Sequence, residues 1–179
     1  MDWNHALQSA LKSESAWLQF IERQLEANPH RKDWIEWTLD QKKNLPSTFP
    51  LFILPSLAQE IWKLGPHSPL AKEFLPSVLE RDEAIQHKGL LDPIGDLTFQ
   101  KADGLVHRYE NRCLILPLSF CPVHCRFCFR RNEFQTSKNL FKIDFQDMAH
   151  YLSLHPEIDE VILTGGDPLL LSNKKIEMI

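Results

Sequence analysis

The chain contains three closely spaced cysteines, Cys121, Cys125 and Cys128, in a C-x3-C-x2-C pattern. Cysteine thiolates hold iron-sulfur clusters, and a cubane cluster has four irons, so three ligands leave one iron open to a ligand from outside the protein. The spacing therefore predicts a 4Fe-4S cluster with one iron available for chemistry.

The sequence also leaves room for different roles of these thiols. A structural zinc site needs four ligands, normally as two pairs, and no second pair of cysteines or closely spaced histidines accompanies the first. His124 or Cys113 could still complete a tetrahedron. Disulfides are disfavoured, because nothing at the N-terminus resembles a signal peptide and cytosolic thiols stay reduced. A chance group of buried cysteines is the remaining alternative.

The composition is that of an ordinary globular protein acting on a small molecule. Of the 179 residues, 43% are hydrophobic and 25% are charged, and the formal net charge is -4. An acidic balance argues against a general nucleic-acid or anionic-membrane partner, since such proteins normally carry a basic excess. The apolar runs are short and contain prolines, far below the ~20 residues of a membrane helix. We therefore expect a cytoplasmic protein with no nucleic-acid or membrane partner.

The first part of the sequence has a helical pattern and is rich in tryptophan. All five tryptophans precede residue 63, and their helical spacing in a non-basic segment predicts a packed core and not a base-stacking surface. Helices are expected at 14–27 and 33–43, and a third is expected to start at a capping box from Ser56 and end at Gly65. We predict an N-terminal helical region over residues 1–95.

From residue 96 to residue 179 the pattern changes to α/β. Residues 113–116 and 161–163 read as buried strands, a helix capped by Asp144 lies between them, and a helix capped by Ser172 or Asn173 follows. This order is the repeating unit of a parallel α/β fold, in which the chemistry lies at the carboxyl ends of strands. We predict the first β/α units of a partial TIM barrel, incomplete in what we take to be a truncated chain, because a full barrel takes roughly 200 residues or more.

The cysteine loop resembles the signature of the radical S-adenosylmethionine superfamily, which follows the first strand of its barrel. Residues 107–112, 121–131 and 164–169 resemble the lysine 2,3-aminomutase family, above all the branch that supplies β-lysine for the modification of elongation factor P. The likeness extends over roughly residues 45–179 and leaves residues 1–44 without a recognisable motif.

The resemblance implies an isomerase that moves the α-amino group of L-lysine to the neighbouring carbon to give β-lysine. Such an enzyme uses a 4Fe-4S cluster, S-adenosyl-L-methionine and pyridoxal 5'-phosphate (PLP), needs an electron donor for the cluster, and could assemble as a homo-oligomer. By resemblance, the cluster ligands are Cys121, Cys125 and Cys128, the S-adenosylmethionine site includes Gly165, Gly166 and Asp167, the PLP phosphate site includes Arg108, Tyr109 and Arg112, and Arg130 binds the substrate carboxylate.

The resemblance places no catalytic residue within the chain itself. The family's Schiff-base lysine and the carboxylates that select the substrate amine are expected beyond Ile179. We therefore expect the chain alone to be inactive in the amino shift, although it could bind a cluster and part of S-adenosylmethionine.

Each assignment has a simpler structural alternative. Gly165-Gly166-Asp167 also fits a glycine-rich turn with a helix-capping aspartate, and Arg108 and Arg112 also fit solvated surface residues. Cys113 lies outside the signature and is expected to pack within the first strand. For the whole protein, the competing functions are another radical S-adenosylmethionine reaction and a zinc-stabilised module that binds a protein partner.

Overall fold

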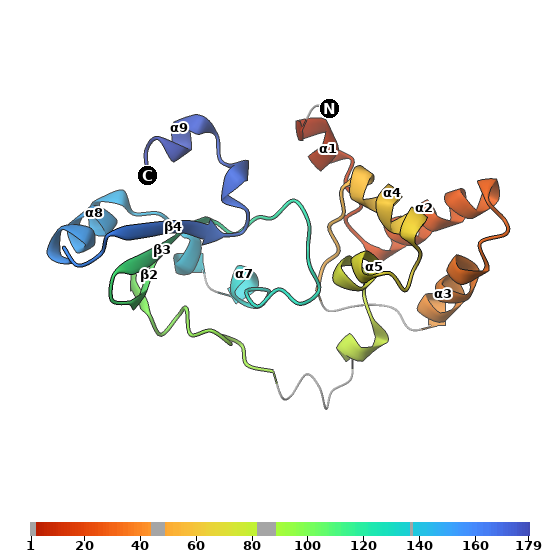
Figure 1. Cartoon of the computed structure of the whole chain (residues 1–179), viewed down its shortest axis with the longest axis horizontal. Helices are drawn as coiled ribbons and strands as arrows, with labels where there is room; N and C mark the ends of the chain where they lie inside the picture. Colours follow the sequence, from red (N-terminus) through yellow and green to blue (C-terminus); the bar gives the residue numbers. More distant parts are fainter. Residues whose placement is uncertain (1–2, 44–48, 82–88, 137) are drawn as a thin grey trace. The chain divides into compact units, whose positions relative to one another are not determined.

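The computed structural model describes residues 3–43, 49–81, 89–136 and 138–179. The chain divides into two compact units, which are coloured along the sequence in Figure 1. We call Met1–Gly89 with Pro122–Cys128 the N-terminal unit, and Leu90–Cys121 with Phe129–Ile179 the sheet unit. Within the described ranges, no helix has both the length and the apolar composition that crossing a membrane would require.

The N-terminal unit is built from helices whose ends follow local capping rules. The Ser13 hydroxyl accepts a hydrogen bond from the Ala16 N–H and so starts α2, which ends before Asn28 as the sequence predicted. The Ser68 hydroxyl starts α5 in the same way. The elements are α1 (Trp3–Gln8), α2 (Glu14–Ala27), α3 (Lys32–Lys43), α4 (Pro55–Leu64), α5 (Pro69–Phe74) and the short 3-10 helix η1 (Val78–Arg81).

The core of this unit is a group of packed tryptophans. The rings of Trp34 and Trp62 stack with centroids 5.5 Å apart, and Trp17 packs against Trp34 at 5.9 Å. The indole N–H of Trp34 donates to the carbonyl of Trp62 at 3.0 Å, which satisfies a fully buried polar group. The prediction of a packed core is confirmed for these three residues, whereas Trp3 is 46% exposed.

The predicted capping box at Ser56 is wrong. Helix α4 begins one residue earlier, at Pro55, after Leu54, whose side chain makes no capping hydrogen bond. Proline is favoured at the first helical position because its fixed φ suits the helix and its missing N–H would have no helical partner there. The end of the helix at Gly65 is confirmed, with a φ of +94° that favours glycine.

The sheet unit contains a four-stranded mixed sheet in the order β1-β2-β3-β4. β1 (Gln100–Ala102), β2 (Leu105–Tyr109) and β3 (Arg112–Leu118) pair antiparallel, and β4 (Glu160–Gly165) pairs parallel to β3. Helix α8 (Phe145–Leu154) connects β3 to β4 after α7 (Glu133–Thr136) and η2 (Lys138–Phe141), and η3 (Pro168–Leu170) and α9 (Asn173–Ile176) follow β4 (Figure 1). The mixed α/β class is confirmed, and the continuation into a barrel stays a prediction.

The two faces of the sheet carry alternate residues of each strand. Cys113 and Ile115 pack with Met148 of α8 on one face, while Leu116 packs with Leu140 of η2 on the other. Asp144 caps α8 by accepting hydrogen bonds from the next helical N–H groups, as predicted. The sheet is therefore covered on both sides along β3.

The strand at residues 161–163 was predicted to be buried, and this is wrong for its first two residues. Val161 and Ile162 are 44% and 37% exposed. β4 lies at the edge of the sheet, where it pairs with β3 alone among the described strands. The antiparallel pair β1 and β2 was not predicted either, although Asp103-Gly104 between them is a typical hairpin turn.

We expect Trp34→Ala to lower the free energy of unfolding by about 3 to 5 kcal/mol, because a large buried aromatic side chain leaves a cavity. The matched control is Trp3→Ala, which changes a half-exposed ring at the surface. Chemical denaturation followed by fluorescence measures both. Equal effects of the two substitutions would contradict the assignment of Trp34 to the core.

Candidate functional site

The candidate site begins where β3 and β4 end side by side. Because the strands are parallel, their carboxyl ends meet at one edge of the sheet, with Leu118 paired to Gly165. Beyond the strands, the Gly166 N–H donates to the Leu118 carbonyl at 2.8 Å and the Asp167 N–H donates to the Phe120 carbonyl at 2.9 Å. The glycine motif is thus hydrogen-bonded to the residue directly before Cys121.

Both glycines are required by this close approach. Gly165 has a φ of +103°, and a Cβ there would lie 2.7 Å from the Leu118 carbonyl oxygen. A Cβ on Gly166 would collide with the carbonyl oxygen of Phe120. The sequence predicted that these glycines let the backbone come close to a ligand. In the structure they let the backbones of the two strand ends come close to each other.

Asp167 acts as a cap in this structure. Its carboxylate oxygen Oδ1 accepts a hydrogen bond from the Leu169 N–H at 3.0 Å at the start of η3. The simpler interpretation of this aspartate is therefore confirmed. A contact of Asp167 with the amino group of S-adenosylmethionine stays a prediction.

The second and third cysteines lie in the N-terminal unit and Cys121 lies in the sheet unit. The Cys128 N–H donates to the Cys125 carbonyl at 3.2 Å, which closes a tight turn. Burial, and next the neighbouring Cys128, raise the pKa of the Cys125 thiol. In neither unit do three His, Cys, Asp or Glu side chains of the described residues gather as a preformed metal site.

The three thiols of the cysteine loop differ from Cys113 in how accessible they are. Cys121, Cys125 and Cys128 are not joined in disulfides and are partly exposed, so they remain accessible. Cys113 is 1% exposed and packs within the sheet as predicted, and burial raises the pKa of its thiol. Cys113 therefore serves as a packing residue of β3. His124 packs between aromatic rings and its Nδ1 donates to the Pro50 carbonyl at 3.0 Å.

Arg126, between the last two cysteines, anchors this loop to the N-terminal unit. Its guanidinium donates to the Glu80 carboxylate at 3.0 Å and to the Phe49 carbonyl at 3.1 Å, and its backbone N–H donates to the Glu73 carbonyl at 2.7 Å. The side chain is 7% exposed. No pattern in the sequence pointed to this role, because each partner is distant in the chain.

Arg130 is buried in the sheet unit among acidic groups. Its Nε donates to Asp96 Oδ2 at 2.7 Å, and a terminal nitrogen donates to the Thr164 hydroxyl at 3.1 Å. The Phe129 ring covers the guanidinium at 4.7 Å. Thr164 directly precedes the glycine motif, so the structure brings Arg130 and Gly165 to the same strand end. The predicted contact with a substrate carboxylate is not tested by this arrangement.

Glu133 is an acidic residue that the sequence did not single out. It is 1% exposed, and its Oε2 lies 3.8 Å from Nε of Arg130, beyond hydrogen-bonding distance. No donor among the described residues reaches either of its carboxylate oxygens. Burial, followed by the charges of Asp96 and Asp92, raises the pKa of Glu133 to about 7. Glu133 is therefore poised to exchange a proton near neutral pH.

The segment 92–97 positions Asp96. The Asp92 carboxylate accepts hydrogen bonds from the N–H groups of Asp96 and Leu97 at 2.9 and 3.0 Å. Arg108, one of the predicted phosphate-binding residues, donates to the Ile94 carbonyl at 2.7 Å. Arg108 thus binds this loop at Ile94, and the loop in turn binds Arg130 through Asp96.

The structure separates the three predicted phosphate donors. Arg108 points to the 92–97 loop, whereas Arg112 pairs with Glu160 at 3.3 Å where β3 and β4 begin. At ordinary strand rise, that end of β3 is about 20 Å from the end where the cysteine loop starts. Tyr109, the last residue of β2, is 60% exposed. A shared phosphate role for the three residues stays a prediction.

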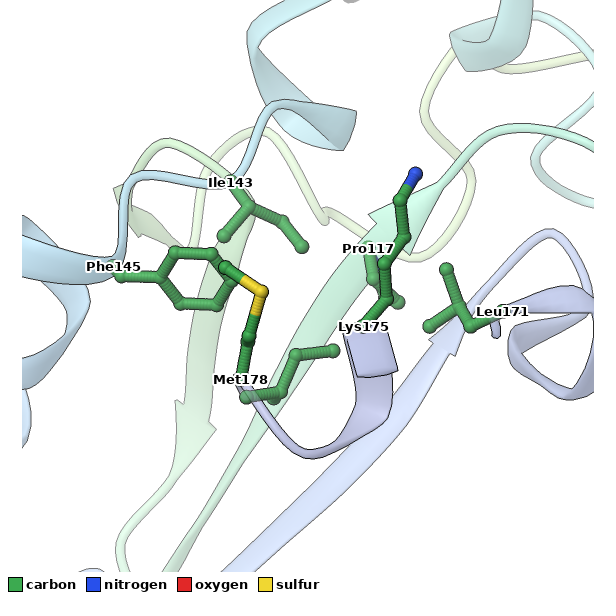
Figure 2. A pocket seen from close by; sticks show the side chains of 7 residues that line it. Pro117, Ile143, Phe145, Leu171, Lys175 and Met178 are labelled. Carbon is green, nitrogen blue, oxygen red and sulfur yellow. The ribbon is translucent and has the colours of Figure 1, made fainter. Parts of the chain in front are cut away.

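A separate cavity of about 290 Å³ lies in the sheet unit. Figure 2 shows its apolar side chains turned toward one another, with the amine of Lys175 directed away from them. None of the predicted site residues lines it. The lining residues are Pro117, Ile143, Phe145, Leu171, Lys175, Met178 and Ile179.

Comparison with known proteins agrees with the cysteine spacing. Residues 110–179 match the family described as a 4Fe-4S single cluster domain. The chain is 30% identical over 176 residues to a putative L-lysine 2,3-aminomutase of Aquifex aeolicus, which covers 93% of the chain and 46% of that protein. It is 33% identical over 132 residues to the L-lysine 2,3-aminomutase of Escherichia coli, covering 73% of the chain and 37% of that protein.

The chain belongs to the lysine 2,3-aminomutase family. A further relative, the L-lysine 2,3-aminomutase of Clostridium subterminale, is 29% identical over 167 residues, or 91% of the chain and 40% of that protein. The chain spans less than half of the length of these three aminomutases. The 4Fe-4S match includes all three cysteines of the loop and the glycine motif.

In this aminomutase homologue we expect Gly166→Ala to open the contact between the two strand ends. The added methyl group meets the Phe120 carbonyl, which is backbone and cannot rotate away. Amide hydrogen exchange at Asp167 should accelerate at least tenfold, since a loss of about 1.4 kcal/mol in local stability has that effect. Leu169→Ala, which truncates a side chain that is 85% exposed, is the control and should leave the exchange unchanged.

We expect the stability of the protein to fall as pH rises from about 5 to 8 because of Glu133. Its pKa is raised from 4.5 to about 7 in the folded protein, so the folded state holds a proton that the unfolded chain releases across this window. Glu133→Gln should remove on the order of 2 to 3 kcal/mol of this pH dependence. Denaturant titrations at the two pH values measure it, and parallel profiles for both proteins would refute it.

Proposed function

We propose that the chain forms the cluster-binding part of a radical S-adenosylmethionine enzyme that converts L-lysine to β-lysine with PLP. The observation that carries the proposal is the hydrogen-bonded contact between Gly166-Asp167 and the segment that leads into Cys121. It sets the segment that leads into Cys121 beside a glycine motif at the carboxyl ends of two parallel strands, where α/β enzymes bind their ligands.

Three thiolates of the loop, Cys121, Cys125 and Cys128, would hold a 4Fe-4S cluster. The cluster with S-adenosylmethionine supplies a radical able to take hydrogen from an unactivated carbon, which ordinary acid and base side chains cannot do. Gly165 and Gly166 keep the strand ends close, and Asp167 would offer a carboxylate to the ammonium of the methionyl group. An external electron donor would reduce the cluster.

Arg130 would bind the carboxylate of the amino acid. Guanidinium groups are the preferred partners of carboxylates, and this one is already oriented by Asp96 and Thr164. Arg108, Tyr109 and Arg112 would contribute to PLP phosphate binding, although Arg112 pairs with Glu160 in this structure. We propose that the lysine that binds PLP covalently is supplied by sequence that corresponds to the uncovered part of the relatives.

The relatives favour lysine as the substrate, because the two from Escherichia coli and Clostridium subterminale are named L-lysine 2,3-aminomutases. We further propose that the product β-lysine serves the modification of elongation factor P in the cytoplasm. A homo-oligomeric state is compatible with this function.

The cluster is tested by anaerobic reconstitution of the chain with iron and sulfide. We expect about four irons per chain, and an electron paramagnetic resonance spectrum of the reduced cluster that changes when S-adenosylmethionine is added. Alanine substitution of Cys121, Cys125 or Cys128 should reduce bound iron at least fivefold. Cys113→Ala is the matched control and should retain iron, because Cys113 is a buried packing residue.

Two outcomes would reject the proposal. A purified protein that contains one zinc and no iron or sulfide would favour a zinc-stabilised binding module. A cluster whose spectrum is unchanged by S-adenosylmethionine would show that no iron is open to it.

A further inference from the structure

The charges around Arg130 are unbalanced. One guanidinium faces two buried carboxylates, Asp96 at 2.7 Å and Glu133 at 3.8 Å from its Nε. The three side chains are 6%, 4% and 1% exposed, so solvent screens them poorly. If both acids are ionised, the group carries an excess negative charge before any ligand arrives.

The two carboxylates are held in different ways. Asp96 accepts a short hydrogen bond from the guanidinium. Glu133 has no donor within hydrogen-bonding reach in the described part of the chain, and the carboxylate of Asp92 lies beside it. Asp92 accepts hydrogen bonds from two backbone N–H groups, whereas Glu133 accepts none from the described residues. Glu133 is therefore the carboxylate that the surrounding structure stabilises least, and it is the one that we expect to hold a proton.

The guanidinium keeps donors for a ligand. Nε serves Asp96 and one terminal nitrogen serves Thr164, while no described residue accepts a hydrogen bond from the other terminal nitrogen. An anionic carboxylate arriving there adds a further negative charge next to Asp96 and Glu133. Because three anions around one buried cation are unfavourable, one of the acids must be neutral for the ligand to bind.

Resting on the proposed role of Arg130 in binding a carboxylate, we infer that Glu133 is a positioning residue whose protonation is coupled to the binding of an anionic carboxylate at Arg130. The neutral acid leaves the guanidinium to Asp96 and the ligand. The ionised acid competes with the ligand for the same cation. The charged groups that act on Glu133 are Asp92 and Asp96 from the 92–97 loop and Arg130 from the segment before α7.

The experiment uses acetate as the carboxylate probe on the 15N-labelled chain, with the side-chain Nε–H signal of Arg130 as the readout at pH 6 and pH 8. Acetate stays ionised at both values. The pKa of Glu133 is about 7, so the fraction that carries a proton falls about tenfold over this range, and acetate should bind about tenfold more weakly at pH 8. A chloride salt keeps the ionic strength constant, so that non-specific screening is the same in every sample.

Glu133→Gln keeps the size of the side chain and cannot ionise. In this variant the affinities for acetate at pH 6 and pH 8 should agree within twofold. The control is Glu177→Gln, which changes an exposed glutamate of the sheet unit and should keep the tenfold difference. The inference is overturned by a tenfold difference that survives in Glu133→Gln, by equal affinities in the unsubstituted protein, or by an Arg130 signal that acetate does not change.

A second measurement needs no ligand. Asp96→Asn removes a negative charge that raises the pKa of Glu133, so the pKa read from the 13C signal of the Glu133 carboxyl should fall by at least one unit. An unchanged value would overturn the coupling. These readouts are independent of iron and of S-adenosylmethionine, so the coupling can fail while the cluster assignment stands, and the reverse.

Discussion

The parallel pairing of β3 with β4 is the constraint on which the candidate site depends. Parallel strands end at the same edge of a sheet, so the segments that follow them must run close together. Here the two segments are the start of the cysteine loop and the glycine motif, and the backbone hydrogen bonds of Gly166 and Asp167 hold them in contact. Any side chain at Gly166 would separate them, which explains why glycine stands there.

Much of the fold was predictable because its signals are local. The apolar run at 113–116, the cap at Asp144 and the stop at Gly65 each act within a few residues, and the structure confirms all three. The exposure of Val161 and Ile162 was not predictable in this way. Whether an apolar strand is central or at an edge is decided by which other strands pair with it, and the strand's own residues are the same in both cases.

The site was predictable to the extent that its residues are neighbours in the sequence. The cysteine spacing is visible directly, whereas Asp96 and Arg130 meet across 34 residues and Glu133 looks like an ordinary loop acid. Arg108 and Arg112 illustrate the opposite error. They are close in the sequence, yet they lie on successive strands of a hairpin and hold different partners, Ile94 and Glu160.

The residues of the cysteine loop have two different tasks. The cysteines are the proposed cluster ligands, and the buried arginines fix the loop in place. The three cysteines are only partly buried, and among them Cys125 packs against the core of the N-terminal unit. Arg126 and Arg130 lie on either side of Cys128 and are each buried with a carboxylate, Glu80 in the N-terminal unit and Asp96 in the sheet unit. Breaking a buried ion pair costs several kcal/mol, far more than losing an exposed one. The fixed charges therefore hold the segments from which accessible thiols extend, and a substitution of either arginine should disturb the proposed cluster binding without touching a proposed ligand.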